Sequence, residues 1–128
     1  MTEVGRVPNI GPLVGVIVWT SAVRFPDLRR FYIDVLGLSP RSDRPSMVNF
    51  DWPGFRLTLG VHDEVEGTNR QPARIMINFG ADDLDATHDL LSEAGVRCLR
   101  PPSEEPWGGR VATYLDPDDN VLQLLELP

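Results

Sequence analysis

The spacing of hydrophobic residues near the start of the chain changes from a continuous run to a helical period. The β-rich run over residues 14–19 predicts a short strand. The apolar residues that follow recur at intervals of three and four and predict one face of a helix: Leu28, Phe31, Tyr32, Val35 and Leu36. Pro26 suits the first turn of this helix, and Gly37 suits its end.

Two or three strands are expected after this helix. Residues 47–51 form one candidate, and residues 55–61 form another with clear alternation of apolar and polar side chains. Between them, Pro53 and Gly54 occupy the second and third positions of a type II turn, so these strands are predicted to form a hairpin. The polar, aperiodic stretch 62–72 is predicted to be a connector.

The second half of the chain repeats this order of elements. A strand is predicted over residues 74–79, and Asp82 or Asp83 is predicted to cap a helix that ends at Gly95. The apolar residues of that helix are Leu84, Leu90, Leu91 and Ala94. The remaining predicted elements are strands over residues 96–99, 111–115 and 121–127, a loop over 101–109 and a turn over 116–120.

Matching residues of the two halves lie 58 positions apart, as for Asp27 and Asp85 or Gly37 and Gly95. An internal duplication of a βαβββ unit explains this offset. We therefore predict a single α+β domain over residues 1–128, with an irregular arm over 1–12 and modules over about 12–61 and 73–127. A helix should cover one face of each sheet, and the other faces should line a concave, partly closed, barrel-like cavity.

Composition narrows the possible partners. The 128 residues include 12 basic residues, all of them Arg, and 19 acidic residues, which gives a net charge of −7. This acidic balance disfavours nucleic acid or an anionic membrane as a partner. No apolar run approaches the ~18 residues of a membrane span. Residues 1–9 lack the apolar core of a signal peptide, so a cytoplasmic location is expected.

Cysteine usage excludes two further classes of protein. The single cysteine, Cys98, cannot form an internal disulfide framework or a zinc site with several cysteines. It is expected to be a small buried residue rather than a nucleophile.

Three stretches of the sequence resemble the vicinal oxygen chelate superfamily of glyoxalases, bleomycin resistance proteins and extradiol dioxygenases. Residues 31–38 are similar to its first-helix signature, residues 106–110 to a loop of its bleomycin-resistance-like branch, and residues 116–120 to its last turn. In that turn the family usually has Gly where this chain has Asp119. The resemblance covers residues 12–127 and implies a homodimer. One scaffold of this kind supports many chemistries, so it does not identify a substrate.

The resemblance also implies where a metal would be held. Metal-dependent members present His or Glu from four strands, and the matching positions here are Ile17, Arg56, Arg74 and Gln123. Ile has no donor atom, and Arg has no lone pair to offer a cation. The two histidines, His62 and His88, belong to the connector and the second helix. We therefore expect neither a metal centre of the usual kind nor a cofactor.

Strand parity predicts which side chains face the cavity. If the alternating apolar residues face the helices, the side chains between them point into the cavity. Trp107 lies in a Gly-rich loop that could act as a lid over it. The predicted ligand-binding residues are Trp19, Arg56, Thr58, Arg74, Met76, Trp107 and Gln123. An apolar pocket with a few polar groups is typical of a small-molecule site.

Arg56 and Arg74 require compensation, because two guanidinium groups in one semi-enclosed cavity repel each other and lose hydration. A carboxylate, phosphate or enolate-like oxygen of a ligand could neutralise them. The alternatives are internal salt bridges, for example to Asp51 or Asp116, or contacts across a dimer. The sequence leaves these possibilities open.

The leading functional prediction is metal-independent binding of a small aromatic or anionic molecule, as in sequestering members of the superfamily. The alternative is a metal-independent enzyme, a lyase, isomerase or cyclase, in which Arg56 and Arg74 stabilise an enolate-like oxygen. A third hypothesis is a structural or regulatory partner protein without a ligand.

Overall fold

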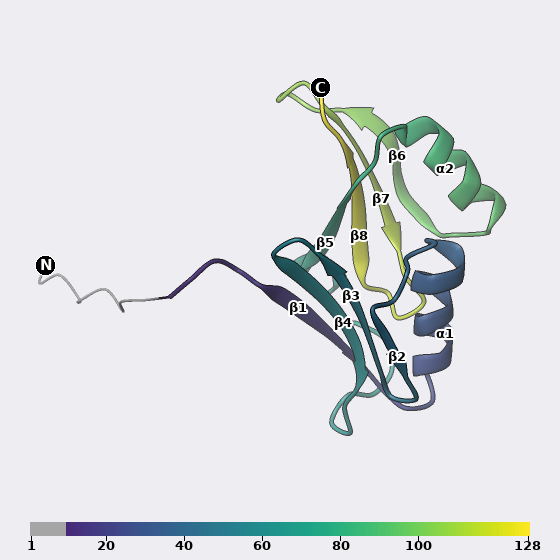
Figure 1. Cartoon of the computed structure of the whole chain (residues 1–128). Coiled ribbons are helices and arrows are strands. Elements are labelled where there is room, and N and C mark those ends of the chain that lie inside the picture. The colour runs from purple at the N-terminus through teal and green to yellow at the C-terminus, as the bar shows by residue number, and fades with distance from the viewer. Residues whose placement is uncertain (1–9) are drawn as a thin grey trace, which may run out of the picture.

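The computed structural model describes residues 10–128 as two modules joined by a connector (Figure 1). Most of the arm expected over residues 1–12 therefore lies outside the described residues. In the first module, β1 (Gly15–Thr20) leads into α1 (Phe25–Arg30), which continues as the π-helical turn η1 (Phe31–Val35). Three strands follow: β2 (Ser42–Arg44), β3 (Met47–Trp52) and β4 (Phe55–Val61).

The second module repeats this order. It begins with the 3₁₀ turn η2 (Pro72–Arg74) and β5 (Met76–Gly80), followed by α2 (Leu84–Glu93). Its last three strands are β6 (Cys98–Glu104), β7 (Arg110–Leu115) and β8 (Val121–Glu126). Gly37 and Gly95 both adopt positive φ just after the helical segments, at 74° and 77°. These matched helix ends confirm the repeat.

Each module folds into a mixed sheet of four strands, in the orders β1-β4-β3-β2 and β5-β8-β7-β6. β1 pairs with β4 and β5 pairs with β8 in parallel, whereas the other pairs are antiparallel. The predicted hairpin is confirmed, with Gly54 at φ 76° in its turn. The α+β class with two βαβββ modules is thereby confirmed. β1 and β5 are edge strands of their sheets.

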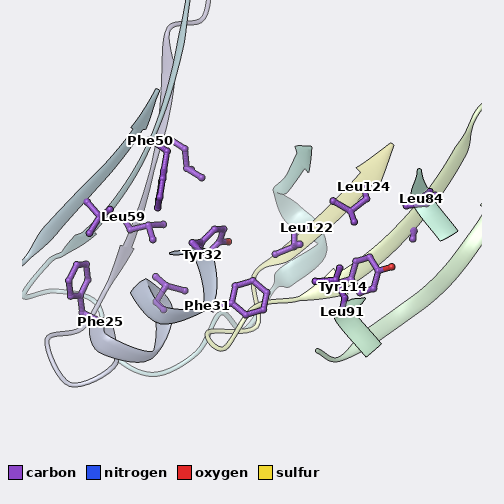
Figure 2. Close-up of a cluster of buried hydrophobic side chains, with 14 residues drawn as sticks. Phe25, Phe31, Tyr32, Phe50, Leu59, Leu84, Leu91, Tyr114, Leu122 and Leu124 are labelled. Atoms are coloured by element: carbon purple, nitrogen blue, oxygen red, sulfur yellow. The ribbon is translucent and has the colours of Figure 1, made fainter. Parts of the chain in front are cut away.

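The core lies between the sheets and their helices (Figure 2). Leu57 and Leu59 of β4 pack with the residues of α1 and η1, as the alternation predicted. Leu122 and Leu124 of β8 occupy the equivalent place in the second module. Because these residues point toward the helices, their neighbours along each strand are left on the opposite, concave face.

The modules are joined at the turn between β7 and β8. Asp116 in this turn is fully buried, and its Oδ2 accepts a hydrogen bond from the Tyr32 hydroxyl at 2.8 Å. Burial raises the pKa of Asp116, although its four hydrogen bonds act in the opposite direction. Arg24 reaches the same turn and bonds Asp118 at 2.6 Å. These contacts fix the first helical segment of one module against the last hairpin of the other.

The second module departs from the predicted boundaries at two strands. β5 begins at Met76 rather than Arg74, because Pro72 starts a 3₁₀ turn that the Arg74 amide closes on the carbonyl of Gln71. β6 runs through Pro101 and Pro102, which were expected in a loop. Proline is tolerated there because β6 is an edge strand with one unpaired side.

One burial prediction is wrong: Cys98 is exposed rather than buried, since it begins the edge strand β6. Leu84 and Leu91 define the buried face of α2, and Leu90 is exposed. Among the described residues, no helix is long and apolar enough to cross a membrane.

Candidate functional site

The two concave faces carry similar polar pairs at their centres. In the first sheet, Thr58 lies beside Ile17 of β1 and donates from Oγ1 to Oδ1 of Asn49 at 2.6 Å. In the second sheet, Gln123 lies beside Asn78 of β5 and donates from Nε2 to Oγ1 of Thr113 at 3.2 Å. Each pair joins an amide and a hydroxyl, and both groups are uncharged.

This register revises the positions that the resemblance implied for metal ligands. The four central positions of the concave faces are Ile17, Thr58, Asn78 and Gln123, so Thr58 and Asn78 replace Arg56 and Arg74 in that set. None of the four is a carboxylate or an imidazole. No group of three or more His, Cys, Asp or Glu residues that could hold a metal ion occurs within residues 10–128.

Trp19 provides the main aromatic surface of the first concave face. Its indole lies directly over Gly60, where an added Cβ would be 2.7 Å from Cζ3 of the ring. The imidazole of His62 meets the indole edge-on, with ring centroids 5.3 Å apart. Trp19 nevertheless remains 37% exposed. The missing side chain of Gly60 thus lets the indole lie against the sheet while part of the Trp19 side chain stays exposed.

Trp19 lines a cavity of about 340 Å³ between β1, the connector and β5. Ile17 and Ile77 form part of its apolar wall, and residues 65–69 of the connector close one side. Asp118 and Asn120 border it from the turn after β7. The connector is held in place because the backbone N–H of Asn69 donates to the backbone carbonyl of Asp118 at 2.7 Å.

Arg56 is already paired within the protein. Its Nε and Nη2 donate to the two carboxylate oxygens of Asp51 at 2.7 and 3.1 Å, and Nη1 of Arg41 lies 3.3 Å from the same carboxylate. The hydrogen bond from Arg56 holds the pKa of Asp51 below its ordinary value. The cluster contains two guanidinium groups and one carboxylate, so its net charge is +1. It borders a shallow hollow of about 750 Å³ that Thr58 also lines.

The other predicted site residues lie apart from this cluster. Arg74 belongs to η2 and donates from Nε to Oε1 of Gln71 at 2.9 Å. Met76 is exposed on β5, in register with Val121. Trp107 lies against the backbone of Gly109 in the β6–β7 loop and is 48% exposed. Arg56 and Arg74 thus have different partners on different elements.

Several residues of the site were not named as candidates from the sequence. Asn49 and Thr113 complete the central polar pairs, yet each is a single polar residue in a strand and carries no motif. The connector residues 65–69 belong to a polar stretch without periodicity. Asn78 alone could have been found, because strand parity already placed it on the cavity side.

The chain belongs to the Glyoxalase/Bleomycin resistance protein/Dioxygenase superfamily, whose family model matches residues 23–124. This confirms the resemblance to vicinal oxygen chelate proteins. Proteins of this superfamily often bind small molecules and form dimers. A stretch of 56 residues is 34% identical to the uncharacterized protein YraH of Bacillus subtilis (strain 168). That match covers 43% of this chain and 44% of YraH, so it spans less than half of that relative.

Solved structures show the same fold over nearly the whole chain. A glyoxalase/dioxygenase from Nostoc punctiforme has a TM-score of 0.78 at 18% identity, over 100% of this chain and 99% of that one. A glyoxalase-related enzyme from Fulvimarina pelagi has a TM-score of 0.73 at 20% identity, over 93% and 90% of the two chains. A superfamily member from Burkholderia phytofirmans PsJN has a TM-score of 0.72 at 19% identity, over 92% and 100%. At these identities the similarity establishes the fold alone.

Proposed function

We propose that the protein binds a small, flat organic molecule on the concave face of its first sheet, without a metal. The observation that carries this proposal is the half-open indole of Trp19, which lies against Gly60 beside an apolar cavity. An aromatic ring in this position offers a large stacking surface that loses little conformational freedom on binding. The adjoining Thr58 and Asn49 groups can orient a ligand through uncharged hydrogen bonds.

The charge near this face supports a ligand with an acidic group at one end. Arg41 and Arg56 share a single carboxylate, that of Asp51, so the cluster keeps one uncompensated positive charge. A carboxylate on the ligand would be attracted by this net charge, while the Nε and Nη2 donors of Arg56 stay on Asp51. We therefore favour an aromatic carboxylic acid over a neutral or cationic molecule.

An enzyme that uses Arg56 to stabilise an enolate is the less favoured function. The guanidinium already donates twice to Asp51, so a developing oxyanion would compete with an ionised carboxylate for the same donors. Recovery of the ligand tests this directly, because a binding protein returns the molecule unaltered and an enzyme converts it.

We further propose that a second copy of the chain covers the concave face. Apolar side chains are exposed on and beside the strands of this face, among them Val14, Ile17 and Met76. Apolar exposure of this extent on adjacent elements is typical of a protein interface. Analytical ultracentrifugation should show a dimer, and a monomer at micromolar concentration would contradict this proposal.

The binding experiment uses 2-naphthoate as the probe, measured by calorimetry. Trp19→Ala should weaken binding at least tenfold, which corresponds to about 1.4 kcal/mol, because the stacking surface is lost. Trp19→Phe should retain part of the affinity. Leu90→Ala, which removes an exposed apolar side chain on α2, serves as the matched control and should bind like the unaltered protein. Equal affinity of Trp19→Ala and the unaltered protein would refute the proposed site.

A further inference from the structure

A second cleft opens between the two modules, on the helical side of the sheets. It has a volume of about 320 Å³. Its first wall comes from β1 and the β3–β4 hairpin and includes Val16, Trp52, Phe55 and Leu57. Its second wall comes from β5 and includes Ile77 and Phe79. The rings of Trp52 and Phe79 lie across it with centroids 6.2 Å apart.

Most of the side chains that line the cleft point to the helical side of the sheets. Leu57 belongs to the buried core, and Ile77 and Phe79 pack against that core. Trp52 follows Phe50 by two residues on β3, so its side chain points to the same helical side. The cleft therefore adjoins the core at a place where no side chain fills the space.

The cleft exists because β1 and β5 are edge strands that do not pair with each other. The two sheets remain separate, and no backbone hydrogen bond joins β1 to β5 within the described residues. Side chains on the two walls consequently meet at the Trp52–Phe79 contact but leave space beside it. Trp52 is 41% exposed there, although it is one of the largest apolar side chains in the chain.

The lining chemistry indicates the kind of molecule that fits. Every residue that borders the cleft is uncharged. A charged ligand would lose hydration there without gaining an opposite charge. An uncharged aromatic molecule would instead bury its faces against rings from both modules. The volume is of the size that accommodates a small fused ring system.

We propose that this cleft is a second binding site, for a flat, uncharged aromatic molecule of one or two rings. The occupant contacts both modules and adds to the contacts that Tyr32 and Asp116 already make between them. This site does not depend on the binding proposed at Trp19, because Trp52, Phe55 and Phe79 line this cleft but not the cavity at Trp19, and Trp19 lines only that cavity, although Val16 and Ile77 border both.

The test uses indole as the probe and backbone amide chemical shifts as the measurement. Indole should produce saturable shifts at residues 77–80, which line the cleft. Trp52→Ala should weaken indole binding at least fivefold. Phe79→Leu should weaken it about threefold and keeps an apolar side chain against the core. Leu90→Ala again serves as the control on α2 and should leave the affinity unchanged.

Three results would overturn the proposal: no saturable shifts, shifts confined to the surroundings of Trp19, or unchanged affinity in both cleft variants. The two sites can be separated by charge. Trp19→Ala should weaken 2-naphthoate binding at least tenfold and leave indole binding unchanged, whereas Phe79→Leu should weaken indole binding about threefold and leave 2-naphthoate binding unchanged. If one variant fails to show its expected effect, the effect of the other variant can still be measured. Either binding site can therefore be refuted without refuting the other.

Discussion

Replacement of Tyr32 by Phe removes one hydroxyl from the contact between the modules and keeps the aromatic ring. The hydroxyl donates to Oδ2 of Asp116 at 2.8 Å, and both residues are 0% exposed. A hydrogen bond to a charged group contributes about 1.5–3 kcal/mol, and one to a neutral group about half as much. Because Asp116 keeps three other hydrogen bonds, we expect Tyr32→Phe to lower the free energy of unfolding by about 2 kcal/mol at neutral pH.

The effect of this substitution should depend on pH. Burial raises the pKa of Asp116 above its ordinary value, so its contribution to stability is fully present at low pH and falls as the pH rises through the folded-state pKa. The Tyr32 hydroxyl opposes this loss because it stabilises the ionised form. Without it the folded-state pKa rises further, and the difference between variant and unaltered protein should grow from about 1 kcal/mol in acid to about 2 kcal/mol at neutral pH.

Urea unfolding at several pH values measures both quantities. With a typical slope of about 2 kcal/mol per molar urea, the midpoint should fall by about 1 M at neutral pH. Tyr114→Phe is the matched control, since that buried hydroxyl meets Nδ1 of His88 at 2.7 Å instead of a carboxylate. It should lower the free energy of unfolding by about 1 kcal/mol. A loss below 0.5 kcal/mol for Tyr32→Phe at neutral pH, or a loss that grows on acidification, would refute the reasoning.

Three further substitutions test single structural features. Asp83→Ala should lower the free energy of unfolding by about 1 kcal/mol in thermal denaturation, because it removes the side chain that caps α2; an unchanged midpoint would contradict this role. Gly60→Ala should displace the indole of Trp19 and weaken 2-naphthoate binding by about the same factor as Trp19→Phe, with calorimetry as the assay. Gly109→Ala should expel Trp107 from its place on the backbone, which a red shift of tryptophan fluorescence would report and an unchanged spectrum would contradict.

The elements of the fold could be predicted because their signals are local. The alternation over residues 55–61 matches β4. Asp83, one of the two predicted caps, caps α2. The glycines predicted to end the helices follow both helical segments and have positive φ. The boundaries of β5 and β6 were wrong because the edge positions of these strands were not visible in the sequence. An edge strand accepts proline, and a 3₁₀ turn can replace the first residues of a predicted strand.

The candidate site could be predicted only in part. Strand parity correctly separated the two faces of β4, and the open indole of Trp19 lies on the concave side as that parity required. The pairing of Arg56 was left open between a ligand and an internal carboxylate, and the structure shows Asp51 as its partner. The ligand-binding roles of all the predicted site residues remain predictions: Trp19, Arg56, Thr58, Arg74, Met76, Trp107 and Gln123.

The sequence by itself determined the repeated βαβββ order and the superfamily. These properties follow from periodicity, turn residues and residue types, which act over a few positions of the chain. Only the tertiary structure decided that Tyr32 meets Asp116, 84 positions away, and that an apolar cleft remains between the modules. Such contacts depend on how two separate sheets pack against each other, and neither module carries a local signal for that arrangement.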